Sequence, residues 1–188
     1  MLAANQLKDK NKALYLLYMW QIEDIIRKFH GDLDLLEKNL IAHYDVDDTV
    51  RQEIRQWYAN LCTMMREEGK MEHGHLQINN NVLINLADMN QQLLASDKFP
   101  YYGQMYQRML PYIVELRAKA ANAGNTQLEN TPEAELEQLF TFLYCATYLK
   151  LEYREFSEST AQVVKDVTAF FNQLCDYYNK FKAGELEL

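Results

Sequence analysis

Hydrophobic residues recur every three or four positions along most of the chain, and the segment 14–29 shows this pattern most clearly. At 100° per residue, five of its apolar side chains share one side of a helix: Leu14, Tyr18, Ile22, Ile25 and Phe29. Three more lie on roughly the opposite side: Leu16, Met19 and Trp20. Because a helix that is apolar on two sides packs on two sides, we expect this helix in the middle of the protein.

The same spacing, interrupted by glycines, prolines and acidic turns, predicts a series of helices. Their expected ranges are 3–29, 33–44, 49–68, 79–95, 101–121, 132–153 and 158–182. Two-residue alternation never persists over the length of a strand with turn signals on both sides. The sequence therefore predicts an all-α fold, a single helical bundle of six or seven helices with the first and the sixth at its centre.

The third predicted helix, 49–68, is strongly amphipathic. Its apolar stripe repeats at intervals of four and three residues: Val50, Ile54, Trp57, Leu61 and Met64. We expect this stripe to face the core and Trp57 to be a large buried side chain.

We expect one domain over residues 1–188, with a mobile linker at about 122–131. The linker is polar and carries Gly124, whereas the segment Thr131-Pro132-Glu133 has the cap, the proline and the acidic residue that are typical of a helix start. A chain of 188 residues is long enough to bury a substantial core without disulfides or a structural metal.

The charge of the chain narrows the classes of function. It has 19 Lys and Arg against 27 Asp and Glu, a net charge of −8. An acidic chain without a basic run is poorly suited to nucleic acids or anionic membranes, because phosphate contacts need clustered Lys and Arg. No stretch reaches the ~18 apolar residues of a membrane span. We therefore expect no nucleic-acid partner and no membrane association.

The cysteines and the N-terminal residues indicate a cellular compartment. Cys62, Cys145 and Cys175 are odd in number, far apart and each set in an apolar helical pattern, which is typical of reduced, buried thiols. The N-terminal residues lack the apolar segment of a signal peptide. Together these features predict a cytoplasmic protein.

Two short acidic and basic clusters are the main candidates for chemistry. Glu23 and Arg27 lie one helical turn apart, with Asp24 adjacent, and the segment Tyr-Ile-Val-Glu-Leu-Arg repeats the theme with Glu115 and Arg117. Two helices that present such residues to each other would form either a ligand pocket or a structural ion network that fixes helix register. Both interpretations stay open at the level of the sequence.

The histidines suggest a hydrogen-bonding role more than a metal site. Glu72-x-x-His75 has the spacing found in four-helix di-metal proteins, but such sites use two copies and the chain has one. His73 and His75 would point to opposite sides of an extended backbone. We predict no metal and a loop in which one histidine caps or hydrogen-bonds a helix end. Since phosphate-binding glycine loops, nucleophile elbows and Cys-x-x-Cys pairs are missing from the sequence, no cofactor is predicted.

Three segments of the chain resemble those of a known family. They are Tyr15-Leu-Leu-Tyr-Met-Trp-Gln-Ile-Glu-Asp24, Gly74-His-Leu-Gln-Ile-Asn79 and Leu110-Pro-Tyr-Ile-Val-Glu-Leu-Arg-Ala-Lys119. Over nearly its whole length the chain is similar to domain of unknown function 4924, an uncharacterised bacterial family typical of Bacteroides-like bacteria. The resemblance implies a cytoplasmic bacterial protein and supplies no catalytic residues. The ligand-binding candidates are polar residues of these segments and one helical neighbour: Glu23, Asp24, Arg27, His75, Gln77, Glu115 and Arg117.

Two functions fit these observations. The first is a non-enzymatic interaction module that forms a homodimer or binds a protein partner, because 13 Tyr, 8 Phe and 2 Trp on an acidic chain suit a protein interface. The second is a small-ligand-binding protein or metal-dependent enzyme with a Glu/Arg/His site between the first, fourth and fifth predicted helices. A site requires convergence of the candidates around a pocket, whereas an interface requires a flat apolar patch.

Overall fold

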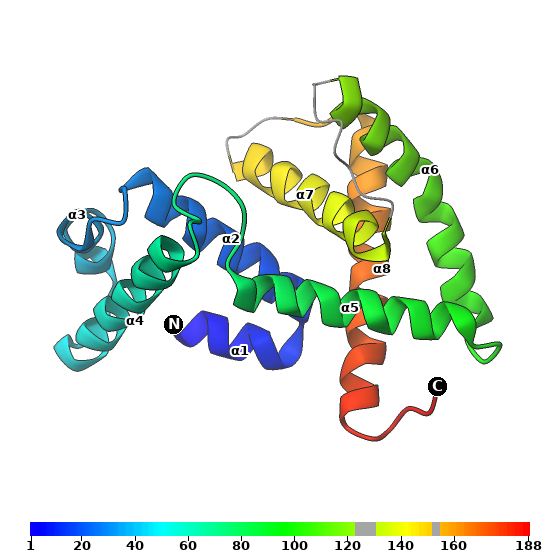
Figure 1. Ribbon diagram of the computed structural model, residues 1–188, viewed down its shortest axis with the longest axis horizontal. Helices are drawn as coiled ribbons and strands as arrows, with labels where there is room; N and C mark the ends of the chain where they lie inside the picture. The colour runs from blue at the N-terminus through cyan, green and yellow to red at the C-terminus, as the bar shows by residue number, and fades with distance from the viewer. Residues whose placement is uncertain (123–130, 152–154) are drawn as a thin grey trace. The chain divides into compact units, whose positions relative to one another are not determined.

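The computed structural model describes residues 1–122, 131–151 and 155–188. Within these residues the chain forms eight α-helices, one short 3-10 helix (η1) and no strand (Figure 1). The helices are α1 (Leu2–Lys10), α2 (Lys12–Lys28), α3 (Leu33–Asn39), η1 (Ile41–His43), α4 (Asp48–Glu67), α5 (Gln77–Ala95), α6 (Pro100–Asn122), α7 (Pro132–Leu151) and α8 (Glu158–Lys182). The predicted all-α fold is confirmed, whereas the predicted number of six or seven helices is too low.

An asparagine divides the first predicted helix and accounts for the higher number. The helix α1 ends at Lys10 and α2 begins at Lys12, so Asn11 lies between them. Oδ1 of Asn11 accepts a hydrogen bond from the backbone nitrogen of Ala13 at 2.9 Å. Such local side-chain bonds compete with the bonds of a continuous helix, and a periodicity of apolar residues does not reveal them.

The described residues divide into two compact units. Unit 1 comprises Met1–Asp9 and Leu14–Asn81, and unit 2 comprises Lys10–Ala13 and Val82–Leu188. The boundaries fall inside α1, α2 and α5, so these three helices contribute residues to both units. The prediction of one domain stays a prediction. The predicted linker falls mainly on residues 123–130, which lie outside the described residues.

Unit 1 is built on α2 and α4, with α3 and η1 packed against each other and against α4. Its core includes apolar side chains with almost no exposure: Leu16, Met19, Ile26, Leu36, Ile41, Tyr58 and Met65. On α2 the more buried side is the one with Leu16, Met19 and Trp20, whereas Leu14 is exposed. The expectation that both sides of this helix are packed is therefore wrong at Leu14.

The buried stripe of α4 is displaced from the predicted one. Ile54 and Leu61 are buried as expected, but Tyr58 and not Trp57 occupies the core between them. Trp57 is half-buried and its ring meets that of Tyr58 edge to face, at 5.1 Å between centroids. The helix begins at an N-cap, Asp47, whose side chain accepts a hydrogen bond from the backbone nitrogen of Val50 at 2.9 Å.

Unit 2 contains three long helices, α6, α7 and α8, that pack against one another (Figure 1). Aromatic side chains fill the space between them. The rings of Phe140 and Phe171 lie 3.9 Å apart, and Phe170 stacks on Tyr102 at 5.6 Å. All four of these side chains are buried.

Two further features of the described residues concern the composition of the helices and the cysteines. None of the described helices combines the length and the apolar composition that a membrane crossing requires. The three cysteines form no disulfide, but their exposure differs: Cys62 and Cys175 are buried and Cys145 is exposed. The expectation that all three thiols are buried is wrong for Cys145.

Candidate functional site

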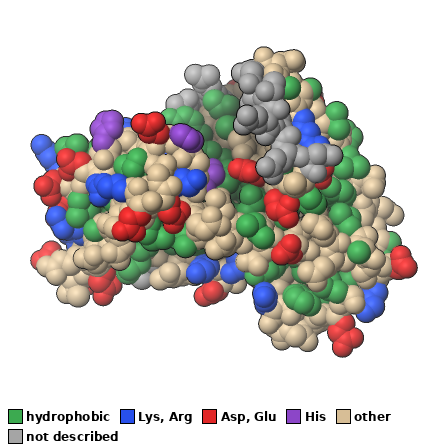
Figure 2. All heavy atoms as spheres, viewed as in Figure 1, with side chains coloured by type: hydrophobic (Ala, Val, Ile, Leu, Met, Phe, Trp, Pro, Cys, Tyr) green, Lys and Arg blue, Asp and Glu red, His purple; other side chains and the backbone are tan. Residues whose placement is uncertain are grey.

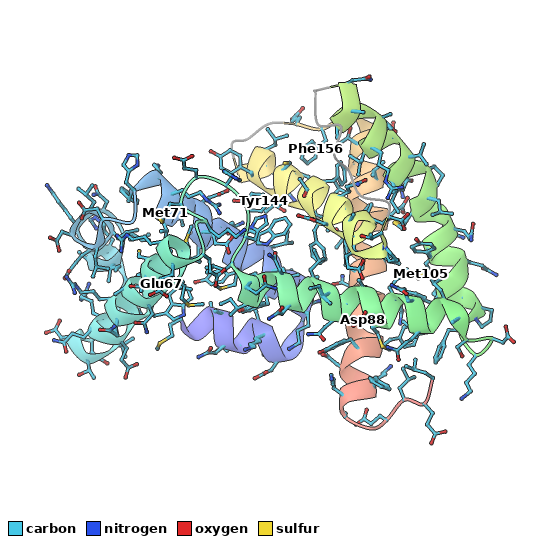
Figure 3. All side chains as sticks on the ribbon, in the orientation of Figure 1. Glu67, Met71, Asp88, Met105, Tyr144 and Phe156 are labelled. Carbon is cyan, nitrogen blue, oxygen red and sulfur yellow. The ribbon has the colours of Figure 1, made fainter. Side chains whose placement is uncertain are left out.

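The helix α2 carries three side chains that meet the segment before α5. Trp20, Glu23 and Arg27 are spaced by three and four residues, so they project from one side of the helix. They contact residues 70–79, the segment that leads from α4 into the first turn of α5. All of these residues belong to unit 1, and Figure 3 labels Met71 in this segment.

Glu23 is a carboxylate with 0% of its side chain exposed. Its Oε1 accepts hydrogen bonds from the backbone nitrogen of Leu76 at 2.9 Å and from Nδ2 of Asn79 at 2.7 Å. Its Oε2 lies 2.6 Å from Nδ1 of His75 and 3.9 Å from Nη2 of Arg27. A buried carboxylate is costly unless it is hydrogen-bonded and paired, and these four groups meet that requirement.

Part of this arrangement stabilises the start of α5. The first nitrogens of a helix have no partner within it, and negative charge is favourable there. Glu23 supplies an acceptor for Leu76, and Oε2 of Glu68 accepts from the backbone nitrogen of Gln77 at 2.7 Å. Two glutamates from outside α5 therefore accept hydrogen bonds from the backbone nitrogens of Leu76 and Gln77. Both residues precede the predicted helix, 79–95.

His75 lies between the carboxylate and an indole ring. Its ring stacks on Trp20 with 3.8 Å between centroids and 7° between planes, and 22% of its side chain is exposed. Because a carboxylate accepts hydrogen bonds, Nδ1 of His75 is the donor to Glu23, and Nε2 is then an acceptor in the neutral ring. This combination of a buried carboxylate and a partly exposed imidazole is one that can move a proton.

Arg27 holds the backbone of the segment that precedes His75, residues 70–74. Its Nε donates to the carbonyl oxygen of Lys70 at 3.2 Å, Nη2 donates to that of Gly74, and Nη1 bonds Asp24 at 2.6 Å. Gly74 has φ +79°, a left-handed conformation that favours glycine and turns the chain into His75. The position of the imidazole is thus set by contacts on both flanks.

The charge of Glu23 also acts on a neighbouring phenol. The pKa of Tyr15 is raised, mainly by burial and also by the negative charge of Glu23. The hydroxyl of Tyr15 is therefore protonated at neutral pH, and Glu23 is the group in this region that provides negative charge inside the core.

The comparisons with known proteins identify the family. A family model, Domain of unknown function (DUF4924), matches residues 1–185. The chain belongs to this family. A search of curated proteins and a search of solved structures gave no match. The match to DUF4924 includes residues of both units, and the description of the family names no activity.

The structure brings several of the predicted candidates of unit 1 together. Glu23, Arg27 and His75 form one cluster, and Asp24, which is exposed, joins it through Arg27. Gln77 lies next to the cluster, but its side chain bonds Asn81 at 2.9 Å and points to the surface.

The two candidates of unit 2 have partners of their own. Glu115 is 62% exposed and pairs with Lys119 at 2.7 Å. Arg117 lies 3.5 Å from Glu135, which also accepts a hydrogen bond from the hydroxyl of Tyr106 at 2.5 Å. A shared site of Glu115 and Arg117 with the cluster of unit 1 stays a prediction.

Sequence reasoning missed two members of the cluster. Trp20 was assigned to packing, and Asn79, which lies in the first turn of α5, was not singled out. Asn79 is 1% exposed, and its Oδ1 has no hydrogen-bond partner among the described residues. No spacing in the sequence marks Asn79, because its role depends on the tertiary contact of its Nδ2 with Glu23 of α2.

The cluster does not have the composition of a metal site. Across the part of the chain that the structure describes, no three His, Cys, Asp or Glu side chains are grouped so that they could hold a metal ion. Figure 2 shows histidine, basic and acidic side chains interspersed over the region of α3 and α4, without a large patch of one sign.

Proposed function

We propose that this DUF4924 protein binds a small protic ligand in unit 1 and that His75 accepts a hydrogen bond or a proton from it. The observation that carries this proposal is the 2.6 Å contact between the fully buried Glu23 and the partly exposed His75. The start of α5 accounts for Oε1 of Glu23, but it does not account for the imidazole bound to Oε2.

The three neighbours of the imidazole have complementary roles in this proposal. Glu23 holds Nδ1 in its protonated form, so Nε2 is the basic nitrogen. When Nε2 takes a proton, the carboxylate of Glu23 and the face of Trp20 stabilise the resulting cation. Asn79 Oδ1 supplies a buried acceptor in the same cluster. A ligand with a hydroxyl, thiol or N–H group matches this set of atoms.

Nitrogen NMR of the histidine side chains tests the arrangement. We expect neutral His75 to carry its proton on Nδ1. In Glu23→Gln, the amide oxygen still accepts from Leu76 and Asn79, so its NH₂ faces His75 and the ring should switch to the form with Nε2 protonated. His73, which is exposed and two residues away, is the internal control. A wild-type ring protonated on Nε2 would refute the proposed role.

Ligand binding itself is tested with a library of small alcohols, phenols and amides. Binding should shift the His75 ring signals and leave those of His73 unchanged, and it should be lost in His75→Phe, which keeps a ring on Trp20 but removes both nitrogens. A library whose members bind equally well to His75→Phe would contradict the assignment of Nε2 as the recognising atom.

A second candidate function is an interaction module that self-associates or binds a protein partner. It is favoured by large apolar side chains that unit 2 exposes, among them Tyr101, Val114 and Tyr148. Measurement of the native mass over a range of concentrations tests self-association. A monomer at all concentrations, in wild type and in Val114→Asp alike, would count against a homodimer.

The proposal also includes a cytoplasmic location. The support is that the three cysteines form no disulfide, which is usual for proteins in reducing compartments. Fractionation of cells that produce a tagged chain tests the location.

A further inference from the structure

A cavity of unit 1 lies among tyrosines and has no part in the cluster of Glu23 and His75. Its volume is about 310 Å³, at the lower end of the range for small-molecule sites. The residues that line it come from α1, α2, the turn after η1 and α4: Met1, Ala3, Tyr18, Tyr44, Asp45, Val46, Ile54 and Tyr58. We call it the tyrosine pocket. Since it shares no residue with that cluster, the inference does not rest on the proposed function.

The lining of the tyrosine pocket is rich in aromatic rings and carries negative charge. Three of the lining residues are tyrosines, and the hydroxyls of Tyr44 and Tyr58 lie 3.5 Å apart. Asp45 adds a carboxylate. Met1, which carries the α-amino group, also lines the cavity, and burial lowers the pKa of this group and so favours the uncharged amine; none of the other described residues of the lining is basic. The face of an aromatic ring is electron-rich and attracts cations, and a carboxylate adds to that attraction.

A basic side chain of α4 holds the backbone of the segment that carries Tyr44 and Asp45. Arg51 donates from Nη1 to the carbonyl oxygens of Ile41 and Ala42 at 3.1 and 2.8 Å, and from Nη2 to that of Val46 at 3.1 Å. These bonds fix the backbone on both sides of Tyr44 and Asp45. Two walls of the tyrosine pocket are therefore held in place before any ligand arrives, which lowers the cost of binding.

The phenols of Tyr18 and Tyr58 stay neutral at physiological pH. Burial is the main cause that raises the pKa of Tyr18 and of Tyr58, and neighbouring tyrosines add to it in both cases. The rings thus act through their faces and their neutral hydroxyls, while Asp45 is the lining side chain that carries the charge.

We propose that the tyrosine pocket binds a small quaternary ammonium ion, one that carries a trimethylammonium head group. Such a cation has no N–H group to donate, so aromatic faces and a nearby carboxylate are the groups that recognise it. A cavity of about 310 Å³ accommodates a single head group of this kind.

The decisive measurement compares choline with 3,3-dimethylbutan-1-ol, which has the same shape and no charge. Calorimetry or NMR titration of the full chain should show that choline binds at least about tenfold more tightly, as expected for cation–π recognition with a desolvated ligand. Equal affinity for the two compounds would mean that the cavity selects for apolar shape, and it would overturn the proposal. Absence of choline binding at millimolar concentration would overturn it as well.

Variants locate the binding within the cavity. Tyr44→Phe keeps the ring and should keep choline binding within about threefold, whereas Tyr44→Leu should weaken it about tenfold or more. Asp45→Asn should weaken it less, by about threefold, because Asp45 is exposed to solvent and its charge is screened. Tyr101→Leu, at an exposed tyrosine of unit 2, is the matched control and should leave binding unchanged. If Tyr44→Leu loses helical structure, Tyr44→Phe and Asp45→Asn still test the proposal. Recognition by ring and charge would be refuted if choline binding were lost in Tyr44→Phe and unchanged in Asp45→Asn.

Discussion

Glu23 and Glu115 are glutamates in similar helical segments, yet one is buried in the protein and the other is exposed to solvent. Glu23 is buried and receives hydrogen bonds from Leu76, Asn79 and His75, whereas Glu115 is mostly exposed and pairs with Lys119 one turn away. A buried polar network costs most when one member is removed, because the remaining groups stay buried without partners.

We predict that Glu23→Ala lowers the free energy of unfolding by about 2–4 kcal/mol. The matched change Glu115→Ala should alter it by less than about 0.5 kcal/mol, as is usual for exposed ion pairs. Urea denaturation of both variants at neutral pH checks the prediction. Equal losses in the two variants would show that burial of Glu23 does not have the consequence argued here.

The candidate site could be predicted from the sequence only in part, and the reasons are local. A helical wheel places Glu23 and Arg27 on one side of α2, and it does so correctly because spacing within a helix is fixed. It cannot show that the segment 70–79 returns to that side, since this depends on the turn at Gly74 and on tertiary contacts. A wheel likewise placed Trp57 on the buried stripe of α4, whereas tertiary packing buries the adjacent Tyr58 and leaves Trp57 half-buried.

At the scale of elements, helix type and extent followed from the sequence, whereas their boundaries depended on single side chains. Six predicted helices match α3 to α8, with the second also taking in η1. The first predicted helix was wrong because the side chain of Asn11 bonds the backbone of Ala13. The start of α5 was placed two residues late, because the glutamates that accept hydrogen bonds there, Glu23 of α2 and Glu68 at the end of α4, come from distant parts of the sequence or from outside the helix.

The start of α4 offers a test of capping within one turn. Asp47 accepts a hydrogen bond from the nitrogen of Val50, whereas Asp48 is almost fully exposed and lies 3.9 Å from Arg51. We predict that Asp47→Ala lowers the free energy of unfolding by about 1 kcal/mol. Asp48→Ala, the adjacent control, should cost a few tenths of that, since it loses mainly a favourable interaction with the helix dipole. Thermal melts followed by circular dichroism measure both, and a larger loss in Asp48→Ala would contradict the assignment of Asp47 as the cap.

At the scale of the whole molecule, the all-α class was predictable because apolar residues with a helical period run through nearly the whole chain. The division into two units was not, because α2 and α5 carry the same periodicity on both sides of each boundary. Continuity of these helices leads us to expect that the two units unfold together.

The distribution of tryptophans makes this expectation measurable. Both tryptophans, Trp20 and Trp57, belong to unit 1, so their fluorescence reports on that unit, whereas far-ultraviolet circular dichroism reports on helices of both units. We predict that the two signals have the same midpoint in urea. A loss of ellipticity that continues after the fluorescence change is complete would show that unit 2 is a separate domain.

The unequal exposure of the three cysteines gives the chain a natural labelling position. Burial raises the pKa of Cys175 to about 11 and also raises that of Cys62. At pH 7 both thiols are therefore protonated, shielded from solvent and slow to react. Cys145, in contrast, is exposed on α7. A maleimide dye should therefore attach once per native chain and three times in guanidinium, as intact mass spectrometry would show, and more than one dye on the native chain would contradict this. A fluorophore introduced at Cys145 without any mutation would then report on whatever approaches α7.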